Sequence, residues 1–473
     1  MLYTFFLLLT VPSFLTAQPV SVAQTAYDAY DQYQESTILT RRFRQSDLEP
    51  LLLRWRGHPM FSVTKLGESV EGRAIYDVSF GTGNTQVLLW SQMHGNESTA
   101  TMAGLDLFNF MAANDSLNHL RQTILSSLTV HFVPMLNPDG AETFTRRNAF
   151  DIDLNRDALR LQSPESQLLK HLRDSLNADF GFNLHDQSIH YTAGRTAKPA
   201  TISFLPPAYN LEKEMNGVRT RATQLIVLLN QALQSFIPGQ VGRYDDTFEP
   251  RAFGDNMQRW GTSTILIESG GYPDDPEKQL IRRLNFMLLV TGLHAIATES
   301  YANVPVEDYQ TIPENERQLY DLVIRNVQRE KNGKLYTVDV GINRTEITVD
   351  STMQFFYRSR IQELGDMSVY YGYRELDAAG MIAVPGKVWK HTKKNLKAAS
   401  KLNAKRLMKR GFTTVRVEDV ESEAAARRYI SLDVVPEEYE PDYDFLLGNP
   451  ANFLLKQDGK IRYAIVNGFV FEL

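Results

Sequence analysis

The chain has 473 residues, of which 43% are hydrophobic and 22% are charged, and its formal net charge is −6. This composition is typical of a globular protein, the length predicts two or more domains, and the mild acidity argues against nucleic acid as a partner. The sequence contains no cysteine, which excludes disulfides, thiolate nucleophiles and thiolate metal ligands. Any zinc site must therefore use histidine and carboxylate ligands.

The N-terminus begins with an apolar run from Met1 to about Leu15, which is followed by Thr16, Ala17 and Gln18. This pattern resembles a signal peptide over residues 1–17, although no basic residue precedes the apolar run. The alternative is a buried N-terminal helix. The run is short for a membrane span, and no other segment looks transmembrane. We therefore expect a secreted or periplasmic protein without stable membrane insertion.

Residues 18–303 begin with a helical leader and then alternate between strand and helix patterns. This alternation predicts an α/β domain with an open, mostly parallel mixed sheet that is flanked by helices. The predicted strands cover residues 86–92, 128–136, 180–184, 201–205 and 264–267. The predicted helices cover residues 97–111, 211–236 and 282–297.

The pattern changes after residue 303, where a segment with prolines and acidic residues predicts a linker over residues 304–320. Residues 334–348 and 353–357 read as strands, so we expect a smaller β-rich accessory domain over residues 321–473. A strongly basic stretch from Lys387 to Arg410 predicts a solvated helix face, and an anionic polymer or membrane surface is the alternative partner for it.

Reactive side chains or tight turns follow four of the predicted strands. In open α/β sheets, ligands bind outside the carboxyl ends of the strands, so these residues are expected to converge. The four segments are His94-Gly95-Asn96-Glu97, Asn137-Pro138-Asp139-Gly140, His185-Asp186-Gln187 and Glu268-Ser269-Gly270-Gly271.

A catalytic zinc ion usually takes three protein ligands and leaves one position for water. His94 and Glu97 are three residues apart at a strand-to-helix turn, which lets an imidazole and a carboxylate reach one ion, and His185 would add the third ligand. A His-x-x-Glu pair alone is weak evidence, because many occur on helix surfaces. Glu268 ends an apolar strand, where partial desolvation would raise its pKa toward that of a general base.

Basic residues follow the Asn-Pro-Asp-Gly turn. Arg156 can pair with a carboxylate in bidentate fashion, Asn155 can add hydrogen bonds, and Arg146 can polarise a scissile carbonyl. Each arginine alone is more often part of a surface salt bridge. The group as a whole favours a substrate with an anionic end.

These pieces, in this order, resemble the zinc carboxypeptidases of the carboxypeptidase A/B type over about residues 40–300. The resemblance rests on Leu66-Gly67, Glu71-Gly72-Arg73, the His-Gly-Asn-Glu and Asn-Pro-Asp-Gly segments, Asp153-Leu154-Asn155-Arg156, His185 and Glu268. It implies one zinc ion per chain on His94, Glu97 and His185. It also implies that Glu268 is the general base.

The resemblance assigns the remaining roles as well. Asn155 and Arg156 would hold the C-terminal carboxylate of the substrate, and Arg146, or Arg147 in its place, would stabilise the oxyanion. Tyr244 is the candidate for the mobile tyrosine that caps the bound terminus. This chain departs from the digestive members of the family at Asn96, where those enzymes carry an arginine that makes a secondary substrate contact.

The C-terminal region carries a second resemblance. Residues 321–326 and 338–342 look like the opening of the small β-sandwich of amidohydrolases, and residues 460–468 look like its closing hairpin. The barrel that normally lies between them is absent. We therefore expect an accessory β-rich domain without catalysis.

The sequence thus favours a metallocarboxypeptidase that hydrolyses the last peptide bond of a peptide with a free C-terminus. One alternative is a zinc-dependent amidase or deacylase that acts on acyl-amino acids or cell-wall peptides, since the deacylases related to aspartoacylase share the His-x-x-Glu site. The other is a binding scaffold without catalysis, against which the complete set of ligands, base and carboxylate clamp argues. The sequence does not indicate the oligomeric state.

Overall fold

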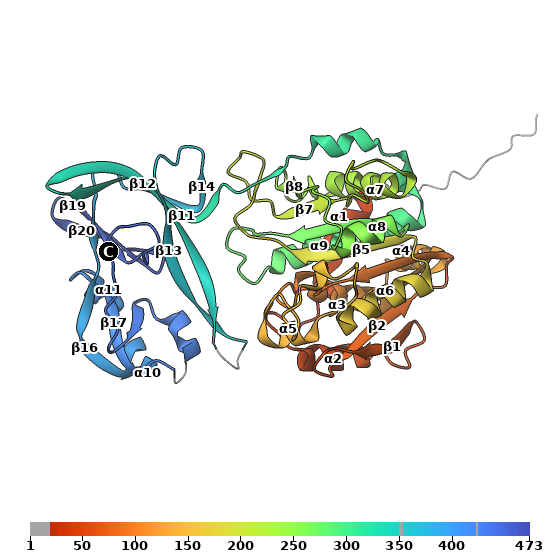
Figure 1. Cartoon of the computed structure of the whole chain (residues 1–473), viewed down its shortest axis with the longest axis horizontal. Coiled ribbons are helices and arrows are strands. Elements are labelled where there is room, and N and C mark those ends of the chain that lie inside the picture. Colours follow the sequence, from red (N-terminus) through yellow and green to blue (C-terminus); the bar gives the residue numbers. More distant parts are fainter. Residues whose placement is uncertain (1–18, 350–352, 422–423) are drawn as a thin grey trace, which may run out of the picture.

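The computed structural model describes residues 19–349, 353–421 and 424–473, so the predicted signal peptide over residues 1–17 lies outside the described residues. Figure 1 shows two bodies side by side, which are joined by the chain that leads into β11 (Leu319–Lys331). Each body contains an eight-stranded sheet.

The first body is built on a mixed sheet with the strand order β1-β2-β4-β3-β5-β9-β7-β8. Its centre is parallel, because β3 pairs in parallel with both β4 and β5, and β5 pairs in parallel with β9. The strands are β1 (Phe61–Glu68), β2 (Ala74–Phe80), β3 (Thr85–Trp90), β4 (Leu128–Val133), β5 (Phe180–Asp186), β7 (Ile202–Leu205), β8 (Val241–Arg243) and β9 (Ser263–Ser269). This arrangement confirms the predicted fold class.

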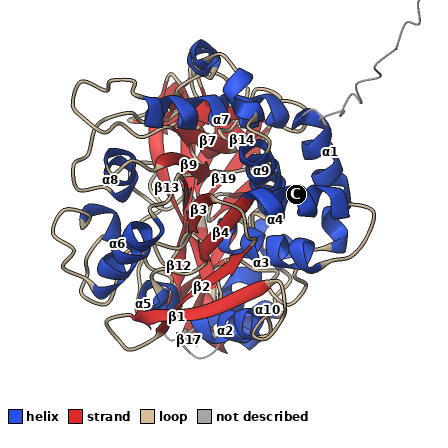
Figure 2. Ribbon diagram, turned by 90° about the vertical axis from the view of Figure 1, so that its right-hand side faces the viewer, coloured by secondary structure: helices blue, strands red, loops and turns tan. Residues whose placement is uncertain are grey.

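Helices cover both faces of this sheet (Figure 2). Along β3, Val87 and Leu89 face one apolar core while Leu88 and Trp90 face the other, as the alternation of side chains in a strand requires. The first face is covered by α1 (Pro19–Ala29), α2 (Gln45–Leu53), α3 (Thr99–Ala112), α4 (Asn118–Ser127), α7 (Gly217–Leu233) and α9 (Gln279–Ala297). The second is covered by α6 (Pro164–Leu176) and α8 (Phe253–Arg259), and the short helix α5 (Pro138–Thr143) follows β4.

Among the described residues, α9 is the one helix that is long and apolar enough to cross a membrane. In its most apolar window, 83% of the residues are buried inside the protein. Packing in the core against α1 and α3 accounts for its apolar character.

The second body is β-rich, as predicted. Its main sheet has the order β13-β12-β11-β15-β19-β20-β21, and β14 pairs with β11 beside this path. The strands after β11 are β12 (Lys334–Thr348), β13 (Phe355–Gly365), β14 (Tyr371–Asp377), β15 (Ile382–Pro385), β19 (Phe453–Gln457), β20 (Lys460–Val466) and β21 (Phe469–Glu472). A smaller parallel sheet contains β16 (Lys387–Asn395), β17 (Phe412–Asp419) and β18 (Asp433–Pro436).

The structure differs from the sequence prediction in the basic stretch from Lys387 to Arg410. Its first nine residues form strand β16, which pairs in parallel with β17, and only α10 (Leu396–Ser400) and α11 (Ala404–Met408) are helical. The reason is that Val388 and Trp389 favour a half-buried pleated surface, and pairing with β17 decides the local structure.

The segment predicted as a linker packs against the first body. It follows the 3₁₀ turn η3 (Ser300–Asn303). It forms the 3₁₀ turn η4 (Val306–Thr311) and the short strand β10 (Asn315–Glu316), which pairs with β6 (Thr192–Ala193). Tyr309 is buried in the first core. The segment therefore fixes where β11 begins.

Candidate active site and metal centre

Three adjacent parallel strands bring the predicted site residues to one edge of the first sheet. His94 follows the end of β3, His185 lies near the end of β5, and Glu268 lies near the end of β9. His185 and Glu268 are direct partners in the register of β5 and β9. The structure thus brings three of the four predicted strand ends together at one edge of the sheet.

The loop after β3 passes so close to helix α5 that it needs a glycine at position 95. A Cβ atom on Gly95 would lie 2.0 Å from the carbonyl carbon of Gly140, in helix α5, so only glycine fits there. The backbone N–H of Glu97 donates to the carbonyl of His94 at 3.0 Å, which closes a tight turn between the two side chains. The turn directs both side chains toward His185.

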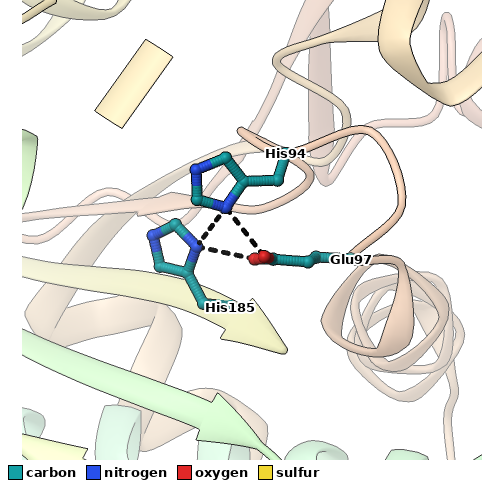
Figure 3. Close-up of side chains that lie close together, drawn as sticks. All are labelled: His94, Glu97 and His185. Atoms are coloured by element: carbon teal, nitrogen blue, oxygen red, sulfur yellow. Dashed lines mark hydrogen bonds and ion pairs between the residues drawn. The ribbon is translucent and has the colours of Figure 1, made fainter. Parts of the chain in front are cut away.

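His94, Glu97 and His185 point toward one another (Figure 3). The Nδ1 atoms of the two histidines are 3.2 Å apart, and each lies 2.8 Å from an oxygen of the Glu97 carboxylate. All three side chains are buried, and their candidate ligand atoms lie within 4.8 Å of one another. Two imidazole nitrogens and a carboxylate that face one point are the ligand set of catalytic zinc sites, so the residues fit a zinc ion.

Asp153 orients His94 from its far side. The Nε2 atom of His94 lies 3.1 Å from Oδ1 of Asp153, and a proton on Nε2 leaves the Nδ1 lone pair facing the centre. His185 has no such support, because its buried Nε2 has no hydrogen-bond partner among the described residues. No sequence pattern assigns Asp153 a role of its own, although it stands two residues before Asn155.

Glu97 and His185 have the protonation that a metal site needs, whereas the pKa of His94 is shifted the other way. Burial opposes the charged form of Glu97, but His94 and His185 outweigh it and hold the pKa of Glu97 well below its ordinary value. Burial lowers the pKa of His185, whereas Glu97 and Asp153 overcome burial and raise the pKa of His94. An ionised carboxylate beside a neutral His185 is the state that metal ligands need.

Glu268 lies beside this cluster as the register partner of His185. Its side chain is buried, and Oε2 makes no hydrogen bond to the described residues. Burial, reinforced by the charges of Glu97 and Asp186, raises the pKa of Glu268 well above its ordinary value. A desolvated carboxylate with a raised pKa is suited to accept and return a proton.

The two candidate arginines lie in different places. Arg146 donates from Nη1 to Oε1 of Glu97 at 3.2 Å and from Nε to Oδ2 of Asp153 at 3.0 Å. Arg147 turns away and donates to the backbone carbonyl of Asp151 at 2.8 Å. Only Arg146 reaches the histidine and carboxylate cluster.

Asn155 and Arg156 lie in the short 3₁₀ turn η2 (Leu154–Arg156) that follows Asp153. The side-chain oxygen of Asn155 accepts the backbone N–H of Phe253 at 2.9 Å, which ties this turn to α8. Arg156 is 39% exposed, and its Nε lies 3.3 Å from the carboxylate of Glu249, which also pairs with Arg251 at 2.8 Å. A substrate carboxylate at Arg156 would therefore meet Glu249 as a competing partner.

Tyr244 follows β8 and is half-buried. Its backbone N–H donates to the carbonyl of Phe204 at 2.9 Å. The charge of Glu268 is the largest cause that raises the pKa of Tyr244, and burial and Glu97 add to it. The tyrosine hydroxyl therefore lies within electrostatic reach of the site.

Lys278 is a buried site residue that the sequence did not indicate. Its Nζ donates to Oδ2 of Asp186 at 3.0 Å and to the backbone carbonyl of Ser269 at 2.9 Å. It precedes α9 with a left-handed backbone, φ 54°, so neither helical periodicity nor a motif marks it. Lys278 links the ends of β5 and β9 next to His185 and Glu268.

Part of the chain matches the model of a known protein family. Residues 55–216 match the family described as zinc carboxypeptidase. This range includes the His94, Glu97 and His185 cluster and Arg156, but it ends before Tyr244 and Glu268.

The sequence matches to curated relatives cover part of the length of each relative. The carboxypeptidase SOL1 of Arabidopsis thaliana is 34% identical over 93 residues, which are 17% of this chain and 19% of that protein. Carboxypeptidase 2 of Trichophyton rubrum is 30% identical over 114 residues, which are 24% of this chain and 20% of that protein. The chain thus spans about a fifth of the length of these relatives. A metallo-carboxypeptidase structure from Burkholderia cenocepacia has a TM-score of 0.46 and 17% identity, with 56% of this chain and 71% of that chain covered.

Proposed function

We propose that the chain is a zinc-dependent carboxypeptidase, on the basis of the match of residues 55–216 to the zinc carboxypeptidase family. It would hydrolyse the last peptide bond of a peptide with a free C-terminus. The observation that carries this proposal is the buried convergence of His94, Glu97 and His185 next to Glu268, whose Oε2 has no hydrogen-bond partner among the described residues. The predicted secreted or periplasmic location is part of the same proposal.

We assign the zinc ion to Nδ1 of His94, Nδ1 of His185 and the carboxylate of Glu97. When bound, zinc would polarise the scissile carbonyl and lower the pKa of a water molecule. Glu268 takes the proton from the attacking water and delivers it to the nitrogen of the leaving amino acid. Water adds across the C–N bond, so the products are a shortened peptide acid and a free amino acid.

Four polar side chains around the cluster take the remaining roles. Arg146 donates to the carbonyl oxygen as negative charge develops on it, in place of its present bond to Glu97. Asn155 and Arg156 bind the terminal carboxylate of the substrate. Arg156 gives up its contact with Glu249 to do so. Tyr244 closes over the bound terminus.

The test is hydrolysis of a peptide and its C-terminally amidated twin by the purified protein in zinc. We expect cleavage of the free acid alone, because the amide offers no charge to Arg156. Cleavage of both peptides would replace the proposal by an amidase or deacylase. Cleavage of neither, by protein that carries zinc, would favour a binding scaffold.

A further inference from the structure

A cavity of about 1020 Å³ lies between the two bodies and reaches the proposed metal centre. Its wall on the first body includes Glu97 itself, its neighbour Asn96, and Asp186, which follows His185. Its opposite wall comes from the second body, through residues on β12, β13, β14 and β21 and in the turn that ends at Tyr429. The proposed active site is therefore bounded by two separate parts of the chain.

Specific contacts hold the second wall in place. Arg42 pairs with Glu346 of β12 at 2.8 Å, and its guanidinium lies 4.1 Å from the ring centre of Phe144 and 4.3 Å from that of Phe355. Nearer the site, the hydroxyl of Tyr373 on β14 donates to the carbonyl of Ile189 at 2.6 Å. These contacts join the second body to the loops that carry the site.

One close approach shows how tightly the two parts fit. A Cβ atom on Gly271 would lie 2.1 Å from the hydroxyl oxygen of Tyr373. Gly271 stands three residues after Glu268, so β14 packs directly on the loop that leaves the end of β9. A larger residue at this position would push the second wall away from the site.

The cavity lies away from the proposed clamp for the substrate terminus. Glu97 and Asp186 line it, whereas Asn155 and Arg156 do not. A peptide that places its terminal carboxylate on Arg156 and its last peptide bond at Glu97 must continue beyond the metal centre. The cavity next to Glu97 is a space that could take up this continuation, on the acyl side of the cleaved bond.

The chemistry of the second wall suits a peptide chain. Tyr357, Phe469 and Tyr429 supply aromatic surface, and Tyr429 is 79% exposed. Of the arginines and lysines that line the cavity, Arg374 alone has no ion pair to a described residue, and it donates only to the carbonyl of Val470 at 3.5 Å. Arg374 is therefore free to bind a carbonyl or carboxylate oxygen of a ligand.

The volume of the cavity also suits a peptide. Pockets for small molecules occupy roughly 300–1,000 Å³, and the volume of this cavity, about 1020 Å³, lies just above that range before the clamp is counted. A single acyl group would leave most of it filled with water. A peptide segment of several residues would cover both walls.

We propose that the second body forms the binding wall for the acyl side of the substrate, so that the protein selects peptides with several residues before the cleaved bond over acylated dipeptides. This inference rests on the proposed carboxypeptidase function. Tyr429 and Arg374 are the wall residues that contact the extended part of the peptide. Binding energy from this remote segment would raise kcat/KM for long peptides.

The experiment compares a hexapeptide with an acylated dipeptide that has the same last two residues. We expect kcat/KM of the wild-type protein to be about tenfold or more higher for the hexapeptide. In the Tyr429→Ala/Arg374→Ala double variant the ratio should fall toward one. Tyr439→Ala is the matched control, because Tyr439 is 50% exposed in the same body and does not line the cavity; it should keep the wild-type ratio.

A binding measurement separates this inference from the proposed function. The dissociation constants of both peptides are measured by calorimetry on Glu268→Gln protein, with and without the two wall substitutions. Hydrolysis of both peptides at equal kcat/KM, or equal affinities in both proteins, would overturn the inference while the carboxypeptidase function stands. Absence of hydrolysis by the wild-type protein would instead overturn the function, and the affinity ratio would still decide whether the wall binds extended peptides.

Discussion

Asp153 accepts three hydrogen bonds at the edge of the metal centre. They come from Nε2 of His94 at 3.1 Å, Nε of Arg146 at 3.0 Å and the backbone N–H of Asn155 at 3.0 Å. Burial opposes its charged form, but His94 and Arg146 hold the pKa of Asp153 far below its ordinary value. Asp153 is thus a charged acceptor at neutral pH that fixes the ring orientation of His94.

Asp153→Asn removes this charge and keeps the size of the side chain. Loss of a carboxylate that supports a metal-binding histidine typically weakens metal affinity about 10- to 100-fold, which corresponds to about 1.4–2.8 kcal/mol. We expect a loss in this range, because His94 keeps its place in the loop but loses its oriented acceptor. Arg146 would also lose one of its two carboxylate contacts, so kcat should fall as well.

The assay is competition for zinc between the protein and a chromophoric chelator. Asp151→Asn is the matched control, because Asp151 is two residues away and its side chain is 91% exposed, with only a 3.7 Å contact to Arg147. The control should bind zinc as the wild type does. Equal zinc affinity of the Asp153→Asn and wild-type proteins would refute the role given to Asp153.

Three further predictions concern the clamp, the contact between the two bodies, and pH. Arg156→Gln should lower kcat/KM for a free-acid peptide by roughly 100-fold, since the terminal carboxylate loses its cation; steady-state kinetics showing an unchanged value would exclude the clamp. Gly271→Ala should destabilise the protein by about 1–3 kcal/mol. Adding Tyr373→Phe should recover part of this loss, because it removes the hydroxyl that the new Cβ atom would strike. If the free energies of unfolding in urea show that the two substitutions are strictly additive, the proposed clash is wrong. Burial raises the pKa of Asp255 from 3.8 to about 7, so between these pH values the folded state binds a proton that the unfolded state does not. The free energy of unfolding should therefore decrease as pH rises from about 4 to about 7. Asp255→Asn should flatten this part of the stability profile, and an unchanged slope would refute the role of Asp255.

The convergence of the site could be predicted from the sequence because it follows from strand order alone. β3, β5 and β9 are buried, apolar and parallel, so their carboxyl ends meet at one edge and carry His94, His185 and Glu268 together. The choice between Arg146 and Arg147 could not be made this way. It depends on the backbone path after α5, where Phe144 has a left-handed conformation and Asn137 donates to the carbonyl of Arg146.

The wall that the second body contributes to the cavity could not be predicted from the sequence either. Its contacts join residues that are far apart in the chain, such as Arg42 with Glu346 and Ile189 with Tyr373. No local pattern marks such pairs. In the basic stretch, charge suggested a solvated helix, whereas pairing with β17 made residues 387–395 a strand.

The most direct test of the central claim is the metal content of the purified protein. The wild-type chain is prepared without added metal, dialysed, and measured by elemental analysis beside the His185→Ala variant. The account predicts one zinc ion per wild-type chain and a clear loss of zinc in the variant. A wild-type protein that also fails to bind added zinc, or a variant that keeps a full equivalent, would contradict the site formed by His94, Glu97 and His185.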